Sequence, residues 1–155
     1  MKEIRLTQGK TALVDDEDFE EVNQYKWYAQ LIEKNWYAIR NLPGAKGKKI
    51  YMHRSIKPGL LRIDHKDGDG LNNQKNNLRP STNGQNIANS RKRRGCSSRY
   101  KGVTWHKHNK TWKAQISVST KMIHLGSFDS EILAAQAYDS AARRHFKEFA
   151  RLNFP

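Results

Sequence analysis

The sequence contains a single cysteine, Cys96, among 155 residues. One cysteine excludes an internal disulfide framework and a cysteine-rich zinc site. The chain also lacks the run of about eighteen apolar residues that a transmembrane helix requires. Its first residues, MKEIRLTQGK, lack the apolar stretch of a signal peptide. We therefore expect a soluble intracellular protein, working in a reducing compartment and without a membrane partner.

Acidic residues are scarce relative to basic ones. The chain has 15 Asp and Glu residues against 29 Lys and Arg residues, a formal net charge of +14 at pH 7. This excess predicts a polyanionic partner, and nucleic acid is the leading candidate because Lys and Arg release counterions that are condensed on phosphates. An anionic membrane surface fits less well, because no segment combines a basic face with a sustained apolar one.

Turn signals and short apolar runs predict that the first sixty residues are rich in β-strands. Residues 27–41 contain two aromatic runs separated by EKN, which is a hairpin signal. Residues 50–56, IYMHRSI, predict a further strand. Residues 16–27 begin with acidic side chains, which favours a short helix because anions stabilise the first helical turn.

Residues 60–94 predict a strand, a polar loop, a second strand and a helix. The strand LLRIDH (60–65) precedes a loop rich in Gly and Asn (66–77), and LRPS (78–81) forms the second strand. Ser81 or Thr82 can cap the helix that follows. We expect this helix to end in four basic side chains that contact the DNA backbone: Arg91, Lys92, Arg93 and Arg94.

A small polar linker (95–99) leads to a C-terminal part (100–155) that predicts three strands and a helix. In the second strand, Trp112, Ala114, Ile116 and Val118 alternate with Lys113, Gln115, Ser117 and Ser119. One sheet face is therefore apolar and the other polar. The apolar helix positions should cover the apolar face and leave the polar face bare: Leu133, Ala134, Ala137, Tyr138 and Ala141.

One group of polar residues in the middle of the chain suits metal-assisted hydrolysis. Asp64 and His65 are adjacent on a strand, so their side chains point to opposite faces and serve different roles. If the helix packs on the hairpin, Asp64 with Asn86 or Asn89 forms an incomplete oxygen-only ligand set, which suits Mg²⁺ or Mn²⁺. His65 is then the general base for a water molecule, and Asn77 would orient its ring.

The segment DHKDGDGLNNQKNNLRPSTNGQNIAN resembles the HNH nuclease motif, the ββα-metal fold of phage and intron homing endonucleases, over about residues 51–94. The resemblance implies that Asp64 binds the metal, His65 is the general base and Asn77 orients it. Asn86 stands where many members have histidine, which makes the chain an H-N-N variant with Asn86 as the second metal ligand. The resemblance to the HNH motif also implies cleavage products with 5′-phosphate and 3′-hydroxyl ends. His53 and Arg54 either contact the scissile phosphate, or help to build the site, or are structural strand residues. Arg54 is also counted among the expected DNA contacts.

Residues 100–155 resemble the AP2/ERF DNA-binding domain, through YKGV, WKAQI, HLGSFDSEILAAQAYDSAA and the terminal LNFP. In that family the bare sheet face lies in the major groove. The resemblance implies base contacts from Thr104, His106, Gln115, Ser117, Met122 and His124, and phosphate contacts from Lys101, Lys107, Lys113 and Lys121. Trp112 is expected in the core, whereas Trp105 suits either face.

The sequence thus predicts an α+β protein with a β-rich segment and ββα-metal module in residues 1–94 and a three-stranded sheet packed on one helix in residues 100–155. The expected function is that of a homing endonuclease that acts as a monomer on double-stranded DNA, with Mg²⁺ or Mn²⁺ and no small-molecule substrate. We expect it in the cytoplasm of a bacterial or phage-infected cell. The alternative is a sequence-specific DNA-binding regulator whose HNH unit is inactive.

Overall fold

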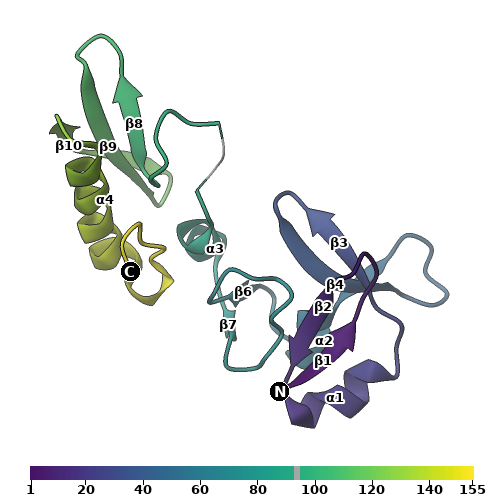
Figure 1. Ribbon diagram of the computed structural model, residues 1–155. Coiled ribbons are helices and arrows are strands. Elements are labelled where there is room, and N and C mark those ends of the chain that lie inside the picture. Colours follow the sequence, from purple (N-terminus) through teal and green to yellow (C-terminus); the bar gives the residue numbers. More distant parts are fainter. Residues whose placement is uncertain (93–94) are drawn as a thin grey trace. The chain divides into compact units, whose positions relative to one another are not determined.

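The computed structural model describes residues 1–92 and 95–155 (Figure 1). The chain is α+β and divides into two compact units, Met1–Ser81 and Thr82–Pro155. The short helix after the central hairpin, predicted as part of the nuclease module, falls within the second of these units. Arg93 and Arg94, two of the predicted DNA contacts, lie outside the described residues. In the described part, no helix has the length and apolarity needed to cross a membrane.

The first unit contains only short elements, and all of its named strands pair with antiparallel neighbours. The predicted acidic helix and aromatic hairpin are confirmed. The elements in chain order are β1 (Lys2–Arg5), β2 (Thr11–Val14), α1 (Asp16–Asn23), β3 (Tyr28–Ile32), β4 (Asn35–Asn41), β5 (Lys49–Tyr51), α2 (Met52–Ile56), β6 (Ile63–His65) and β7 (Leu78–Pro80).

One prediction for this unit is wrong: residues 50–56 do not form a continuous strand. The strand β5 ends at Tyr51, and α2 follows at once. Met52 and Ile56 are four residues apart, so a helical backbone turns both side chains toward the same side, where both are buried. His53 and Arg54 are therefore helical residues.

A single hydrophobic core joins the N-terminal segment to the central hairpin. Ile4 and Val14 from the first hairpin pack in one cluster with Met52 of α2 and Leu78 of β7. Trp27 joins this cluster, and its indole Nε1 donates a 2.7 Å hydrogen bond to the Val22 carbonyl. The β-rich segment and the hairpin that carries Asp64 and His65 therefore fold as one body.

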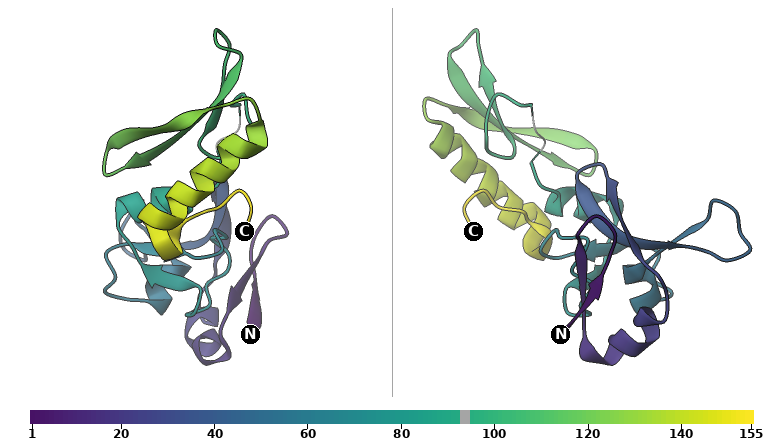
Figure 2. Two further views of the ribbon diagram at one scale, coloured as in Figure 1. Left: turned by 90° about the vertical axis from the view of Figure 1, so that its left-hand side faces the viewer. Right: turned by 45° about the vertical axis from the view of Figure 1, so that its right-hand side comes forward.

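The second unit is a three-stranded antiparallel sheet of order β10-β9-β8 with a long helix on one face (Figure 2). Its elements are α3 (Asn83–Asn89), β8 (Val103–His106), β9 (Thr111–Val118), β10 (Lys121–Phe128), α4 (Glu131–Phe146) and the 3₁₀ turn η1 (Lys147–Phe149). The predicted alternation in β9 is confirmed, because Ala114 and Ile116 are buried and Ser117 is exposed.

Two helix predictions in this unit need correction. On α4, Leu133 is 53% exposed rather than part of the covering face, because Ala134, Tyr138 and Ala142, spaced by four residues, form the buried stripe. Helix α3 ends at Asn89 instead of continuing into the basic run, because Ser90 has extended backbone angles. Arg91 and Lys92 therefore follow the helix. Its predicted cap at Thr82 is confirmed, as part of a capping box with Gln85.

Candidate functional site

Asp64 and Arg79 form a buried ion pair across the β6–β7 hairpin. The register of the two strands places them directly opposite each other. Both Nε and Nη2 of Arg79 lie 2.8 Å from Asp64 Oδ2, and the two side chains are about one-tenth exposed. Charge-assisted bonds to a planar guanidinium fix the orientation of the carboxylate. The motif alone did not point to Arg79, although its position in the second predicted strand, opposite Asp64, could have indicated it.

His65 is buried in the first unit, against two aromatic side chains. Its Nε2 lies 3.5 Å from Asn73 Oδ1, and the ring contacts those of His53 and Tyr37 at centroid distances of 5.1 Å and 6.0 Å. Burial lowers the pKa of His65 below its usual value. The imidazole is therefore mostly neutral at pH 7 and able to accept a proton.

Asn77 was predicted to orient the His65 ring, and its own side-chain hydrogen bonds go to the loop. Its Nδ2 donates to Asp67 Oδ1 at 3.0 Å and to the Asn72 carbonyl at 2.8 Å, and its Oδ1 accepts from the Asp67 amide at 3.1 Å. All of these partners lie in the loop 66–77. Asn77 therefore shapes the loop, while the loop presents Asn73 to His65.

The N-terminal segment supports this loop from outside. Asp15 accepts hydrogen bonds from Gln74 Nε2 at 3.0 Å and from the Lys75 amide at 2.7 Å. The amide of Asn35 also bonds to the loop, accepting from the Gly70 N–H at 3.3 Å. A methyl group at Gly70 would lie 2.4 Å from the Trp36 carbonyl, so only glycine permits this close approach. The β-rich segment thus keeps the loop of the hairpin in place.

His53 lies beside His65, and sequence patterns alone left its role open. Its ring contacts Tyr51 at 5.2 Å as well as His65. Burial, followed by the neighbouring His65 and Arg54, lowers the pKa of His53 to about 3. It is therefore a neutral packing partner of the candidate base over the physiological pH range. Arg54 is exposed, and its place on DNA stays a prediction.

In the second unit, α3 carries the two asparagines predicted as alternative metal ligands. Asn86 Oδ1 is buried and has no hydrogen-bond partner among the described residues. Asn89 is also buried, with 5% of its surface exposed. A buried amide oxygen without a partner is unusual in a folded protein, and it suits a hard cation. Among the described residues, no three His, Cys, Asp or Glu side chains gather into a metal site.

Most of the polar sheet residues predicted to face DNA share one face of the C-terminal sheet, whereas Lys121 pairs with Val118 on the other face. Cross-strand pairing places Lys113 opposite Thr104, and Gln115 opposite His124. Cross-strand partners lie on the same face of an antiparallel sheet. The other predicted contacts of this module lie on the same sheet or in its first turn, and are largely exposed: His106, Lys107, Ser117, Lys121 and Met122.

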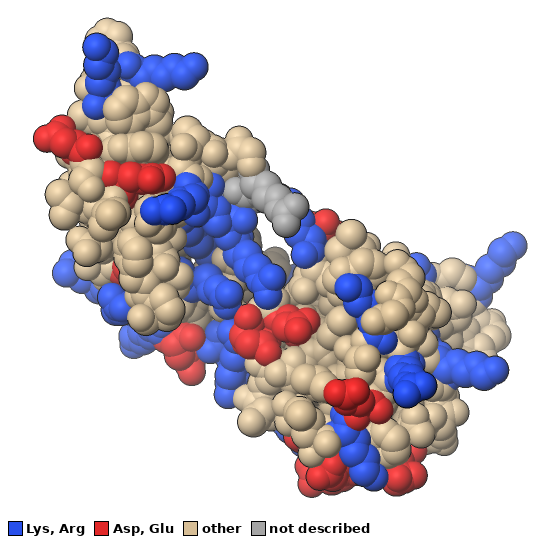
Figure 3. Space-filling view, in the orientation of Figure 1, with Lys and Arg blue, Asp and Glu red and all other residues tan. Residues whose placement is uncertain are grey.

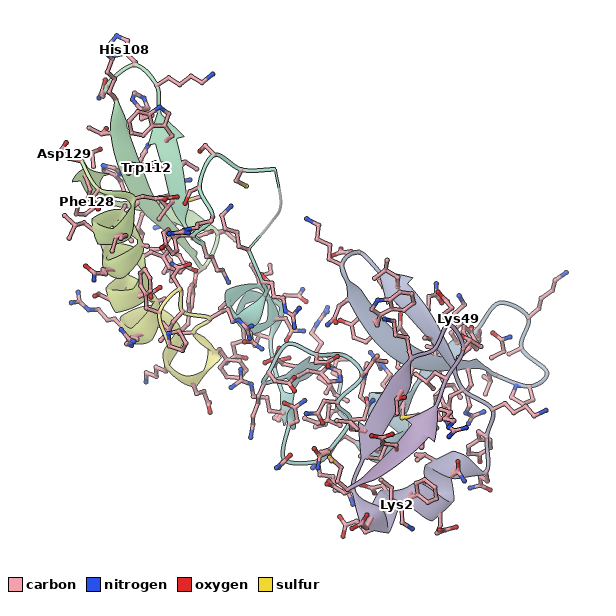
Figure 4. All side chains as sticks on the ribbon, viewed as in Figure 1. Lys2, Lys49, His108, Trp112, Phe128 and Asp129 are labelled. Carbon is pink, nitrogen blue, oxygen red and sulfur yellow. The ribbon has the colours of Figure 1, made fainter. Side chains whose placement is uncertain are left out.

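The tryptophans lie on the opposite, helix-covered face. Trp105 and Trp112 are cross-strand partners with ring centroids 4.9 Å apart. Trp112 also pairs with Phe128, which is labelled beside it in Figure 4, and packs against the core. The expectation of a core role for Trp112 is confirmed, and Trp105 lies on its side of the sheet. Within residues 1–92 and 95–155, no helix covers the polar face of this sheet (Figure 2).

The second unit also has a basic recess with a volume of about 310 Å³. None of the described lining residues is acidic, and Figure 3 shows how widely Lys and Arg are distributed on the surface. Two of its cations, Arg99 and Arg151, are far apart in the sequence and line one recess only in the fold, so local sequence patterns did not point to them. The lining consists of Arg91, Lys92, Arg99, Tyr100, Lys101, Arg151, Leu152 and Asn153.

No protein-family model matches the chain. The chain is 31% identical to an uncharacterised HNH endonuclease of Acanthamoeba polyphaga mimivirus, over 94% of this chain and 75% of the viral protein. It is 30% identical to Protein 3.8 of Escherichia phage T7, over 57% of this chain and 73% of the phage protein. It is 48% identical over 59 residues to an AP2/ERF and B3 domain-containing protein of rice, of which the match covers 16%.

Proposed function

Because the chain belongs to the HNH endonuclease family, we propose that it is a metal-dependent endonuclease that hydrolyses phosphodiester bonds in double-stranded DNA. The observation that carries this proposal is the β6–β7 hairpin, where an Asp64 carboxylate fixed by Arg79 directly precedes a buried His65. The net charge of +14 and the similarity to plant AP2 proteins support DNA as the partner. We propose homing, or movement of the element that encodes the protein, as its biological role.

His65 acts as the general base in this proposal. Its neutral imidazole takes a proton from a water molecule, and the water oxygen attacks the phosphorus. The bond between phosphorus and the 3′-oxygen then breaks, which leaves a 5′-phosphate, and the 3′-oxygen takes a proton from solvent. Asn73, Tyr37 and His53 limit the movement of the imidazole while it accepts the proton.

Asp64 and Asn86 would hold one Mg²⁺ or Mn²⁺ ion, with Asn89 as the alternative to Asn86. When bound, such an ion stabilises negative charge on the phosphate and on the leaving oxygen. Carboxylate and amide oxygens are hard donors, and the unpartnered Oδ1 of Asn86 supports this choice. Arg79 keeps the Asp64 carboxylate oriented, so it acts as a positioning residue.

Asn86→Ala is expected to raise the metal concentration for half-maximal cleavage at least about tenfold, because it removes one of two protein ligands. The measurement is a titration of Mg²⁺ or Mn²⁺ in a DNA-cleavage assay, with binding measured separately in EDTA. Asn76→Ala is the matched control, because Asn76 is an exposed amide of the hairpin loop. If Asn89→Ala shifts the titration and Asn86→Ala does not, Asn89 is the ligand.

The C-terminal sheet recognises the target DNA sequence in this proposal. Its polar face, with Thr104, Lys113, Gln115 and His124, enters the major groove, and the basic recess takes a backbone phosphate. This division assigns sequence reading to Thr104, Gln115 and His124 and affinity to the cations, Lys113 included. The similarity to AP2 proteins favours a DNA-binding regulator as a second candidate, and that function would need the same sheet face but no cleavage.

The double substitution Arg99→Gln and Arg151→Gln is expected to reduce the slope of log affinity against log salt concentration by about one unit, because one phosphate contact is lost. Binding is measured over a series of salt concentrations with the full chain. Arg144→Gln serves as a control, because Arg144 is an exposed cation of α4 that does not line the recess. If the slope of log affinity against log salt concentration equals that of the wild type, the recess does not bind a DNA phosphate.

A further inference from the structure

The Lys101 side chain is bound to the end of α3 within the second unit. Its ammonium donates to the carbonyl oxygens of Ile87, Ala88 and Ser90 at 3.2, 2.5 and 2.7 Å. The last carbonyls of a helix have no donors within the helix itself. Lys101 therefore caps α3 from a position beyond the linker, instead of presenting its charge freely to solvent as a phosphate contact.

Helix α3 needs support of this kind. It has seven residues, and helices of this length do not persist in water on their own. Its last turn contains no basic residue that would offset the helix dipole. Within the second unit, α3 contacts α4 and η1, and the ammonium of Lys101 supplies the missing positive charge.

Lys101 is itself fixed to the long helix of the unit. Its backbone N–H donates to Asn153 Oδ1 at 2.7 Å, and its carbonyl accepts from Asn153 Nδ2 at 3.1 Å. Asn153 in turn donates from its backbone N–H, at 2.9 Å, to Asp139, a buried residue of α4. A continuous series of hydrogen bonds therefore runs from α4 through Asp139, Asn153 and Lys101 to α3.

The charge state of Lys101 is compatible with this role. Burial, and then the nearby Arg151, lower the pKa of Lys101 to about 8. Most of the population is therefore still an ammonium at pH 7, with three N–H donors for three carbonyls. The same burial makes the side chain a poor candidate for an exposed phosphate contact.

We propose that Lys101 is a positioning residue that ties α3, and with it Asn86, to α4 within the second unit. This inference rests on the proposed role of Asn86 as a metal ligand. The C-terminal unit is then part of the nuclease machinery and not only a DNA-targeting attachment. As a consequence, a chain truncated after residue 94 would lose cleavage even on DNA that it still binds.

The test uses Lys101→Met in the full chain, because methionine keeps an apolar stem but removes the three donors. Hydrogen exchange of the backbone amides of residues 83–90, without metal or DNA, is expected to become about tenfold faster or more, with α4 amides unchanged. Lys101→Arg, which keeps N–H donors, is expected to retain part of the protection. Lys110→Met is the matched control, because Lys110 is an exposed lysine of the β8–β9 turn.

Unchanged exchange in α3 of Lys101→Met would overturn the inference, whatever the protein does to DNA. If α4 amides of Lys101→Met also exchange faster, the substitution has loosened the whole unit, and Lys101→Arg becomes the deciding variant. Protection of α3 in Lys101→Arg would support the inference, and loss of that protection would overturn it. In cleavage assays, Lys101→Met is expected to require about tenfold more metal at an unchanged salt slope of DNA binding. Faster α3 exchange together with an inactive wild type would remove the proposed nuclease function but retain the Lys101 connection.

Discussion

Replacing His65 by alanine is expected to slow DNA cleavage by about 10²- to 10⁴-fold, the usual contribution of a general base. The ring is 6% exposed, and its pKa is lowered by burial, so it is the neutral proton acceptor of the hairpin. DNA affinity should change little, because a neutral buried ring makes no ionic contact with phosphate. The measurement is the single-turnover cleavage rate at saturating protein.

His108→Ala is the control for this substitution, because His108 is an exposed histidine in the β8–β9 turn. Its rate should equal that of the wild type. Thermal unfolding of both variants separates a loss of chemistry from a loss of fold. A folded His65→Ala protein that cleaves within about twofold of the wild-type rate would exclude His65 as the general base.

Gly102→Ala is expected to destabilise the second unit by about 2–4 kcal/mol, because it combines an unfavourable backbone angle with a clash in the core. Gly102 has a φ of +77°, and a methyl group there would lie 1.9 Å from Cδ2 of the Tyr138 ring. Tyr138 is 3% exposed, so its ring has no open space to occupy. Gly102 also follows Lys101 directly, so α3 amides should lose protection together with the sheet.

Gly95→Ala separates the two causes of this effect. Gly95 has nearly the same φ, +78°, but nothing lies within 4 Å of an added methyl group. It should therefore cost only about 1 kcal/mol, the backbone contribution alone. Denaturant unfolding of both variants gives the comparison. Equal losses of stability would mean that the contact with Tyr138 does not limit position 102.

Much of the local structure was predictable from short-range patterns. Alternation in β9 indicated which side chains are buried, and Thr82 marked the start of α3, because both signals depend on neighbours within a few residues. The prediction of a strand over residues 50–56 was wrong because a local pattern can be ambiguous: the apolar residues of IYMHRSI have spacings that suit a strand or a helix. Burial of both Met52 and Ile56 decides in favour of the helix.

The polar partners of Asp64 and His65 could not be predicted from the sequence in the same way. Asp64 and His65 were identified from their motif, but the partners of each depend on strand register and loop conformation. Arg79 meets Asp64 because β6 and β7 pair in one register, and Asn73 reaches His65 through a loop conformation that Asn77, Asp15 and Asn35 hold together. The cap of α3 by Lys101 depends on tertiary packing that no local pattern contains.

Direct analysis of DNA products is the most decisive measurement for the proposed nuclease. The full wild-type chain is incubated with supercoiled double-stranded DNA in Mg²⁺ or Mn²⁺, and the ends produced are labelled enzymatically. The proposal predicts cleavage that EDTA abolishes, with 5′-phosphate and 3′-hydroxyl ends. DNA that is bound tightly but stays intact at every metal concentration would contradict it and leave the DNA-binding regulator as the remaining function.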